Sequence, residues 1–540
     1  MRAERQPQGR RLPRLQVAAL VALGAIACGG LGLACARSAV TSPSTTDGGA
    51  QASARGGVAG DGGERDDASG DGGVAPGAAR SGPVQIDEDG NDDPEDPGEG
   101  AAPAAGRFEK VGTPPMALTR ICDLTPLGDA LYAAHAHTPL GSDGATITKY
   151  KADEKKPFGV AFDWNRPGEP TKGGGAGQGF LRVHAIGGRL FVADADPPYN
   201  GLGLIDYGTE GYVFVSDRSG KFAPPRAPNY RPPATPDLLH WEEGRAGAAL
   251  LPRAYHVIDV IRFRGALYAS TGSVPPKERA WHGPSPGAMH RANEDGSRWT
   301  YEADYPYPWQ NGVWRLTFLV RFKDRLYAGI QDYDGRDPND YLYFAPDASS
   351  RVKTADAGAA TPVDAGVREA GAPPEPILRR EDVHPVRVTR TGAAGTLRWW
   401  VDTRAKPARL YWIAWSRDTG IAVRFTTDGD TWTLLPLPAD AGRPTDVTRF
   451  RDAVVVLAER GLYRVAGDAI DPVPLARLDD VPDGGAPPKD KKSPFEVTDF
   501  FCAAPMAVFK NELYAGAQRG GALYKLVWLE RAPAPAVPTP

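Results

Sequence analysis

Seven short apolar steps, most of them carrying an aromatic residue, recur along the chain and predict an all-β fold built as a single seven-bladed β-propeller. Neighbouring steps lie 44 to 84 residues apart, and each follows a one-turn hairpin. A long period built of short strands and Gly or Asp turns is typical of a propeller, with one four-stranded sheet, or blade, per repeat. Six or eight blades also fit this spacing. The steps are Leu131-Tyr132, Leu190-Phe191, Leu267-Tyr268, Leu326-Tyr327, Leu410-Tyr411, Val454-Val455 and Leu513-Tyr514.

Residues 1–36 have the features of an export signal, because an arginine-rich start is followed by the apolar run 15–27. Cleavage before Cys28 or before Cys35 would resemble bacterial lipoprotein processing, in which that cysteine is lipidated. Cleavage at Ala36 would instead give a secreted or periplasmic protein, and an uncleaved segment 15–33 would anchor the chain directly. We expect an exported lipoprotein, anchored in the membrane of the cell envelope.

Residues 37–106 are rich in Gly, Ala, Asp, Ser and Glu and predict a disordered acidic tether. The acidic run 87–99 is interpreted as a solvated spacer, with a Ca²⁺ site as the alternative. The propeller is expected over residues 107–530, with low-complexity insertions at about 347–376 and 479–494. Residues 531–540 form a proline-rich tail.

The expected blades follow in order, and the last one ends a strand short. The segment 108–112 reads like the outer strands of other blades, so we expect it to complete the last blade and remove an exposed edge. The blades are predicted at residues 120–163, 180–228, 255–305, 314–347 with an outer strand near 386–389, 397–438, 445–478 and 495–528.

Charge and cysteine content narrow the function classes. The net charge of −4 gives no sign of the basic surface that nucleic-acid binding needs, so no nucleic-acid partner is expected. We also expect a monomer. Only Cys122 and Cys502 fall in the folded part, nine and eleven residues before their steps, on inner strands of blades that ring closure makes neighbours. An exported protein with such a pair is expected to form a Cys122–Cys502 disulfide. Two buried free thiols are the alternative.

Three turn segments carry a further repeat: 426–432 (TTDGDTW), 293–299 (NEDGSRW) and the weaker 216–222 (SDRSGKF). They resemble the Asp box, or BNR repeat, of sialidase-like propellers. In such a turn the carboxylate of Asp428, Asp295 or Asp217 accepts backbone N–H groups, and glycine supplies a positive φ. Trp432 and Trp299 would cover the hairpin. In that family the boxes lie at the periphery, so the resemblance implies architecture and no activity.

Counting eight residues back from the steps gives Asp123, Arg182, Asp259, Phe318 and Asp446. Inner strands line a propeller's channel, so three carboxylates at one register could surround a polar ligand or a metal ion. The alternative interpretation is that each aspartate ties its strand to the backbone of a neighbouring blade.

Eleven residues back lie Arg120 and Arg315. With Arg182 they resemble the three arginines by which sialidases hold the substrate carboxylate. The Phe/Tyr-Arg-Ile-Pro motif and the Tyr–Glu nucleophile pair of sialidases are missing, so catalysis of that kind is not expected.

The ends of the second strands form another candidate site. His135 and His137 point to one strand face and align with Asp196 and Asp332. Two histidines could form the edge of a metal site, but no third ligand follows at a telling spacing. We expect no metal and no cofactor, with Ca²⁺ bound by the loop 332–337 as the alternative.

Five aromatic residues, Trp281, Tyr305, Tyr307, Trp309 and Trp314, cluster near the junction of the third and fourth blades. Exposed aromatic rings offer flat surfaces for a sugar or a peptide. We therefore expect a binding or scaffolding role at the cell envelope, with a glycan or protein as the ligand. The alternative is a glycosidase- or lyase-like hydrolase that uses channel carboxylates, although no placed acid–nucleophile pair is recognisable.

Overall fold

The computed structural model describes part of the chain. The chain divides into two compact units, residues 1–79 and 80–540, and every described residue belongs to the second. The predicted signal with Cys28 and Cys35, most of the tether, the insertion at 347–376 and the tail lie outside the described residues. Among the described residues, no helix has the length and apolar character needed to cross a bilayer. The described residues are 97–102, 104–115, 118, 120–136, 145–163, 179–194, 211–222, 248–251, 254–273, 287–293, 296, 299–305, 314–332, 337–345, 378–477, 493–498 and 501–528.

Five separate sheets each contain four strands in chain order, as expected for propeller blades. The first is β2 (Arg120–Leu127), β3 (Ala130–Ala136), β4 (Thr146–Tyr150) and β5 (Phe158–Asp163). The second is β6 (Phe180–Ile186), β7 (Arg189–Asp194), β8 (Tyr212–Val215) and β9 (Ala248–Leu250). The third is β10 (Ala254–Phe263), β11 (Ala266–Ser273), β12 (Gly287–Ala292) and β13 (Trp299–Asp304).

The fourth blade is β14 (Trp314–Phe322), β15 (Arg325–Asp332), β16 (Tyr341–Phe344) and β17 (Val383–Val386), with the 3-10 helix η4 (Arg380–Asp382) before its last strand. The fifth is β18 (Ala393–Asp402), β19 (Arg409–Ser416), β20 (Gly420–Thr426) and β21 (Thr433–Leu435). Two predicted boundaries were wrong. The outer strand of the second blade lies at 248–250, beyond the predicted end at 228, and that of the fourth begins three residues early.

The remaining strands form one eight-stranded sheet, so the structure has five separate blades and not the seven that the sequence predicts. Two antiparallel groups of four meet where β25 and β1 run parallel, through the pairs Gly106↔Ala476 and Arg107↔Arg477. This two-residue contact merges the groups. Their strands are β22 (Pro444–Phe450), β23 (Ala453–Ala458), β24 (Gly461–Ala466), β25 (Ala469–Arg477), β1 (Gly106–Gly112), β28 (Leu523–Trp528), β27 (Glu512–Gly516) and β26 (Met506–Phe509).

Strand β1 completes the C-terminal group, which confirms the predicted closure. It pairs antiparallel with β28 from Gly106↔Trp528 to Gly112↔Leu523. The Phe108 ring packs edge-on against Phe495, with 5.0 Å between centroids. Without β1, β28 would present an unpaired edge beside a buried apolar face.

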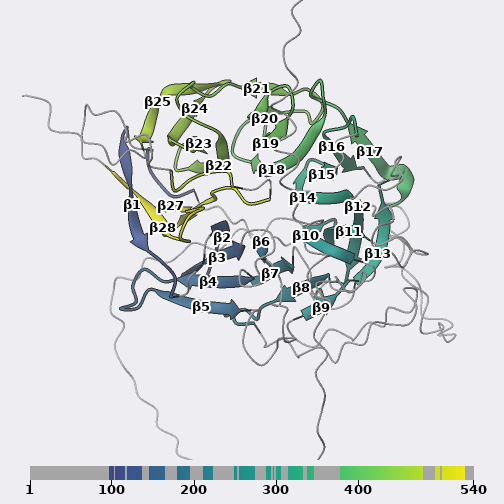
Figure 1. The fold of residues 1–540 in the computed structure, drawn as a ribbon, viewed down its shortest axis with the longest axis horizontal. Coiled ribbons are helices and arrows are strands. Elements are labelled where there is room, and N and C mark those ends of the chain that lie inside the picture. The colour runs from purple at the N-terminus through teal and green to yellow at the C-terminus, as the bar shows by residue number, and fades with distance from the viewer. Residues whose placement is uncertain are drawn as a thin grey trace, which may run out of the picture. The chain divides into compact units, whose positions relative to one another are not determined.

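The sheets surround a common axis (Figure 1). The innermost strand of each group contacts the next, and β26 contacts β2, so these strands form a closed ring. All seven apolar steps lie on the second strand of their group, from Leu131 on β3 to Leu513 on β27. The spacing therefore marked one fixed place in each repeat.

The aromatic residue of an apolar step packs against a turn of the following sheet. These turns are the segments predicted to be Asp boxes, so the apolar steps and the turn segments contact each other. A Cβ atom on Gly220 would lie 2.0 Å from the Tyr132 hydroxyl, and one on Gly429 would lie 2.3 Å from that of Tyr327. Both glycines have positive φ, 74° and 90°. Each turn therefore requires its glycine for two reasons, the positive φ and the close packing against a tyrosine.

The carboxylate pattern predicted for the Asp boxes is present at two turns. Asp428 Oδ1 accepts the amides of Asp430 (2.8 Å) and Thr431 (2.7 Å), and these bonds hold the pKa of the carboxyl well below its usual value. Asp217 Oδ1 accepts those of Ser219 and Lys221. The side chains of Trp299 and Trp432 pack as covers, the first fully buried. Asp295 lies outside the described residues.

The predicted disulfide is confirmed. Cys122 and Cys502 are bonded, with Cα atoms 4.7 Å apart and both residues buried. Cys122 is the extra residue of a bulge in β2, between Ile121 and Asp123, and Cys502 precedes β26. The bond joins the first blade to the eight-stranded sheet.

We predict that Gly429→Ala destabilises the protein more than Gly420→Ala does. Both positions have positive φ, which costs alanine about 1–2 kcal/mol. Only at 429 does the new methyl group meet a neighbour, the Tyr327 hydroxyl, whose residue is fully buried and cannot turn away. Overpacking should add at least ~1 kcal/mol. Equal losses in the free energy of unfolding, measured by chemical denaturation, would contradict the packing contact.

Candidate functional site

A cavity of about 640 Å³ lies at one end of the axis, and its walls include residues from the innermost strand of every group. In the bulged strands, the residues that line the cavity lie from the bulge onward, toward the hairpin to the second strand. Pro97, the first described residue, also lies in the wall. The cavity therefore belongs to the whole ring.

The residues predicted by counting back from the steps lie on innermost strands and share one level. Asp123, Arg182 and Asp446 line the cavity. Asp259 and Phe318 are buried on β10 and β14 just before lining residues. The Arg182 guanidinium lies over the Phe318 ring, 4.0 Å from its centroid. These five residues therefore lie at one level of the channel.

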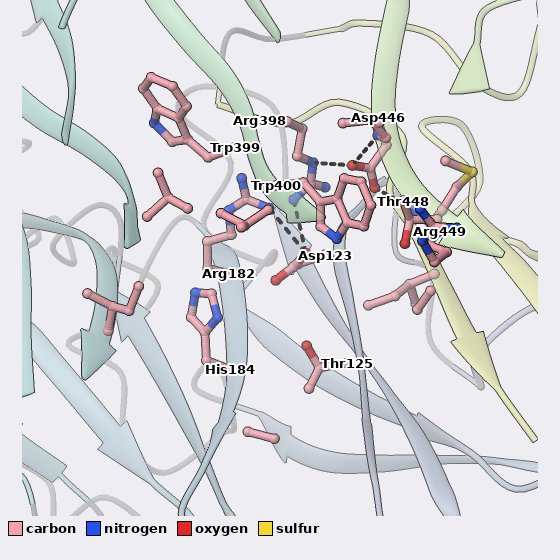
Figure 2. Close-up of a pocket in the computed structure, with 18 of the residues that line it drawn as sticks. Asp123, Thr125, Arg182, His184, Arg398, Trp399, Trp400, Asp446, Thr448 and Arg449 are labelled. Atoms are coloured by element: carbon pink, nitrogen blue, oxygen red, sulfur yellow. Dashed lines mark hydrogen bonds and ion pairs between the residues drawn. The ribbon is translucent and has the colours of Figure 1, made fainter. Parts of the chain in front are cut away.

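Arg398 on β18 connects the carboxylates across the ring, and sequence reasoning missed it. Its Nη1 donates to Asp123 Oδ1 (3.0 Å), its Nη2 donates to the Cys122 carbonyl (2.6 Å), and its Nε lies 3.6 Å from Asp446 Oδ1. Arg182 Nη1 reaches the same Asp123 oxygen at 3.3 Å. Figure 2 shows Arg182 and Arg398 directed toward Asp123 from different strands. Arg398 on β18 therefore contacts two other innermost strands, β2 and β22.

Each of the three aspartates also fastens its strand to the next one, as the structural interpretation of the repeat expects. Their Oδ2 atoms accept backbone amides sixty residues on, from Val183 (3.0 Å), Leu319 (2.8 Å) and Met506 (2.6 Å). The Oδ1 atoms face cations, and those of Asp259 and Asp446 also accept the amides of Val260 and Val447. Asp123 faces two arginines, Asp446 faces Arg398, and Asp259 faces His184. Buried carboxylates need such pairing because an uncompensated charge is costly.

His184 differs from the arginines because it can lose its charge as the pH rises. Its Nε2 lies 2.6 Å from Asp259 Oδ1, and its side chain is 34% exposed, in the cavity wall. Burial disfavours the imidazolium, but the charge and hydrogen bond of Asp259, aided by Asp123, outweigh it and raise the pKa of His184 above 6.5. Asp259 also fixes the ring's orientation.

Asp446 is the carboxylate most affected by burial. Burial raises its pKa to about 6, against the opposing charge of Arg398 and the amides of Met506 and Val447. The neighbouring negative charge of Asp123 adds to the increase. Asp446 is therefore partly protonated in mildly acidic solution.

The lining carries an excess of positive charge. It contains five arginines and His184 against three aspartates, with Asp259, the partner of His184, just behind the lining, in a chain whose net charge is −4. Arg449 and Asp402 form a two-bond ion pair at the wall, with Nε–Oδ1 3.0 Å and Nη2–Oδ2 2.5 Å. Trp400 and Thr448 also line the cavity, and the buried Thr448 hydroxyl has no hydrogen bond to any described residue. The lining arginines are Arg182, Arg321, Arg398, Arg404 and Arg449.

The other predicted site residues do not join this cavity. Arg315 and Arg120 are buried, and Arg315 Nη2 lies 2.8 Å from His256 Nε2. His135 is a core histidine: its ring nitrogens bond the Arg120 carbonyl and the Thr148 hydroxyl, and burial lowers its pKa to about 4. His137 and Asp196 lie outside the described residues, and of Asp332 only the backbone on β15 is described. No cluster of three or more metal-ligating side chains occurs among the described residues.

Arg398 escaped prediction for a geometric reason. Most hairpins between first and second strands are two-residue turns, but β18 and β19 pair from Asp402↔Arg409 with six residues between them. Four extra residues move the equivalent of Asp123 from eight to twelve positions before Leu410. The Lys406-Pro407 step in this connection is the signal that could have revealed its length.

No protein-family model matches the chain, and no curated protein matches its sequence. Solved structures resemble it at low similarity. A catalytically inactive virginiamycin B lyase from Staphylococcus aureus with quinupristin has a TM-score of 0.41 at 8% identity, over 78% of this chain and 100% of that chain. An α-L-arabinanase of Penicillium chrysogenum with arabinobiose has a TM-score of 0.33 at 8% identity, over 79% of this chain and 98% of that chain. The Neurospora crassa Pan2 WD40 domain has a TM-score of 0.38 at 8% identity, over 79% of this chain and 96% of that chain. Ligand and reaction are not inferred from likenesses this remote.

We predict that His184→Gln removes a pH dependence of stability. A histidine whose pKa is raised by folding contributes stability fully below its unfolded value, 6.5, and loses it as pH rises through the folded value. Glutamine can still donate to Asp259 but carries no charge. The variant should therefore be less stable than the parent at pH 5.5, with a difference that shrinks by pH 9 in urea titrations. A constant difference, or one matched by the exposed control His384→Gln, would refute this charge pairing.

Proposed function

We propose that this protein is a ligand-binding propeller of the cell envelope whose axial cavity binds an acidic saccharide. The observation that carries the proposal is the excess of cations in the cavity wall. Clefts lined by one sign of charge concentrate the field and attract ligands of the opposite sign. Because the chain as a whole is acidic, the excess is a property of the cavity.

The other wall groups suit a sugar better than a bare anion. The half-buried Trp400 offers an aromatic surface to a sugar ring. A cavity of about 640 Å³ falls in the range typical of small-molecule sites. Rings for stacking and a few polar groups are what saccharide sites use.

A second candidate is acid–base catalysis on such a ligand, favoured by His184. Hydrolysis by two carboxyl groups is poorly supported, because Asp123, Asp259 and Asp446 each hold an amide and a cation. An imidazole oriented by Asp259 and partly exposed to the cavity is instead suited to remove a proton beside a carboxylate. That chemistry is lyase-like elimination, in which the ligand's leaving group departs with the bonding electrons and a carbon–carbon double bond forms.

The envelope location and the family resemblance complete the proposal. The signal at residues 1–36 supports export with lipidation at Cys28 or Cys35, and the acidic segment would hold the propeller away from the membrane. The Asp-box turns at Asp217 and Asp428 support a sialidase-like relationship at the level of the fold.

Binding should depend on ligand charge and on the cavity rim. We expect the full chain to bind polygalacturonate or dextran sulfate but not dextran in titration calorimetry, with affinity falling as salt rises. Carboxylate and sulfate are thereby tested separately. The exposed rim variant Arg404→Glu should weaken binding roughly fivefold, and Lys156→Glu, an exposed turn residue, should not.

Two other results decide between the alternatives. Equal binding of dextran, or no binding of either acidic polymer, would rule the proposal out. A rise in ultraviolet absorbance from an unsaturated uronate product, lost in His184→Gln, would establish the elimination and exclude a pure binding module.

Lipidation predicts that the mature protein incorporates labelled palmitate and partitions into detergent. Replacing both Cys28 and Cys35 by Ser should move it to the soluble fraction. Continued membrane association of the double variant would show that the uncleaved apolar segment is the anchor.

A further inference from the structure

A second cavity of about 310 Å³ adjoins the first. The connection from β18 to β19 lines both: Thr403 and Arg404 face the axial cavity, and Ala405 and Lys406 face the second one. Strand β19 adds Arg409 and Tyr411 to the wall, and β22, β23 and β24 add Arg449, Val454 and Arg464. Consecutive residues therefore run from one cavity into the other.

The two cavities share Asp402 and Arg449. These residues form the two-bond ion pair described above, with the Asp402 side chain 2% and that of Arg449 16% exposed. A buried pair with matched geometry is a fixed wall, because separating it would leave an uncompensated charge. The shared wall keeps the cavities side by side at a constant separation.

The second cavity is also cationic. Lys406, Arg409, Arg449 and Arg464 line it against Asp402 and Asp452. Both carboxylates are engaged: Asp402 by Arg449, and Asp452 by the Ala102 amide at 2.7 Å. Arg409 pairs at 3.0 Å with Asp468, which is 67% exposed, so solvent screens that contact. Lys406 is exposed and has no ion pair with any described residue.

We propose that the second cavity is a subsite for the neighbouring residues of the same ligand, so that the protein selects a linear acidic polysaccharide over its monomer. The inference rests on the proposed function and extends it from a sugar to a chain. Two adjoining cationic cavities, joined by one backbone connection, fit a polymer that carries a negative charge on successive residues. Occupying the second cavity becomes intramolecular once the first is filled, which increases affinity for longer chains.

The test is a length series. Oligogalacturonates of one to six residues are titrated into the full chain, and the affinity should rise with length and then level off once both cavities are occupied. Lys406→Glu should weaken the hexamer roughly threefold or more and leave the shortest bound oligomer unchanged. Lys156→Glu, the same charge reversal on an exposed turn, should change neither.

The outcomes separate this inference from the one beneath it. Affinity independent of length, or equal weakening of short and long oligomers by Lys406→Glu, overturns the subsite while binding in the axial cavity stands. Failure of every oligomer and of dextran sulfate to bind overturns the proposed function together with the subsite. A melting temperature of Lys406→Glu equal to that of the parent ensures that the comparison concerns binding and not folding.

Discussion

Burial of charge at the axis is the constraint from which the rest of the channel follows. Three aspartates use one oxygen each to hold the next innermost strand, which places the second oxygen where water is scarce. Each second oxygen then requires a cation, and Arg182, Arg398 and His184 supply it. Removing Arg398 would leave the buried Asp446 uncompensated, at a cost of about 3–5 kcal/mol. Asp446, whose cation is the most distant, is the one whose pKa rises to about 6.

The same arrangement shapes what the cavity can do. The carboxylates are committed to amides and cations, so they are poor candidates for the two independent acids of a glycosidase. Arg404 in the rim is less committed, since it is exposed and has no ion pair with any described residue. The paired aspartates thus form the framework of the channel, and we infer that Arg404 in the β18–β19 connection belongs to its binding surface. His184 belongs to both, because it pairs with Asp259 and remains partly exposed.

Local repeats in the sequence predicted most of the fold. The steps from Leu131 to Leu513 marked second strands, the segment 108–112 proved to be the closing strand, and Cys122 with Cys502 formed the expected bond. These predictions needed only periodicity and an exposed edge. The sheet count was wrong, since two parallel pairs between β25 and β1 leave no trace in either strand's pattern. Arg398 was missed because the β18–β19 connection is longer, which shifts register without changing the alternation of residues.

Strand β1 gives the molecule a defined response to mechanical load. A pull on the chain before Pro97 first meets the contacts of Glu99 with Asn511 and of Ala102 with Asp452. It then acts on β1, whose antiparallel bonds to β28 are the next contacts to resist it. Behind β1 the disulfide carries tension from β2 directly to the segment before β26, across 380 residues of sequence. Force entering at the N-terminus is therefore borne by the seam of the ring, and the cavity walls formed by β6, β10 and β14 stay outside its path.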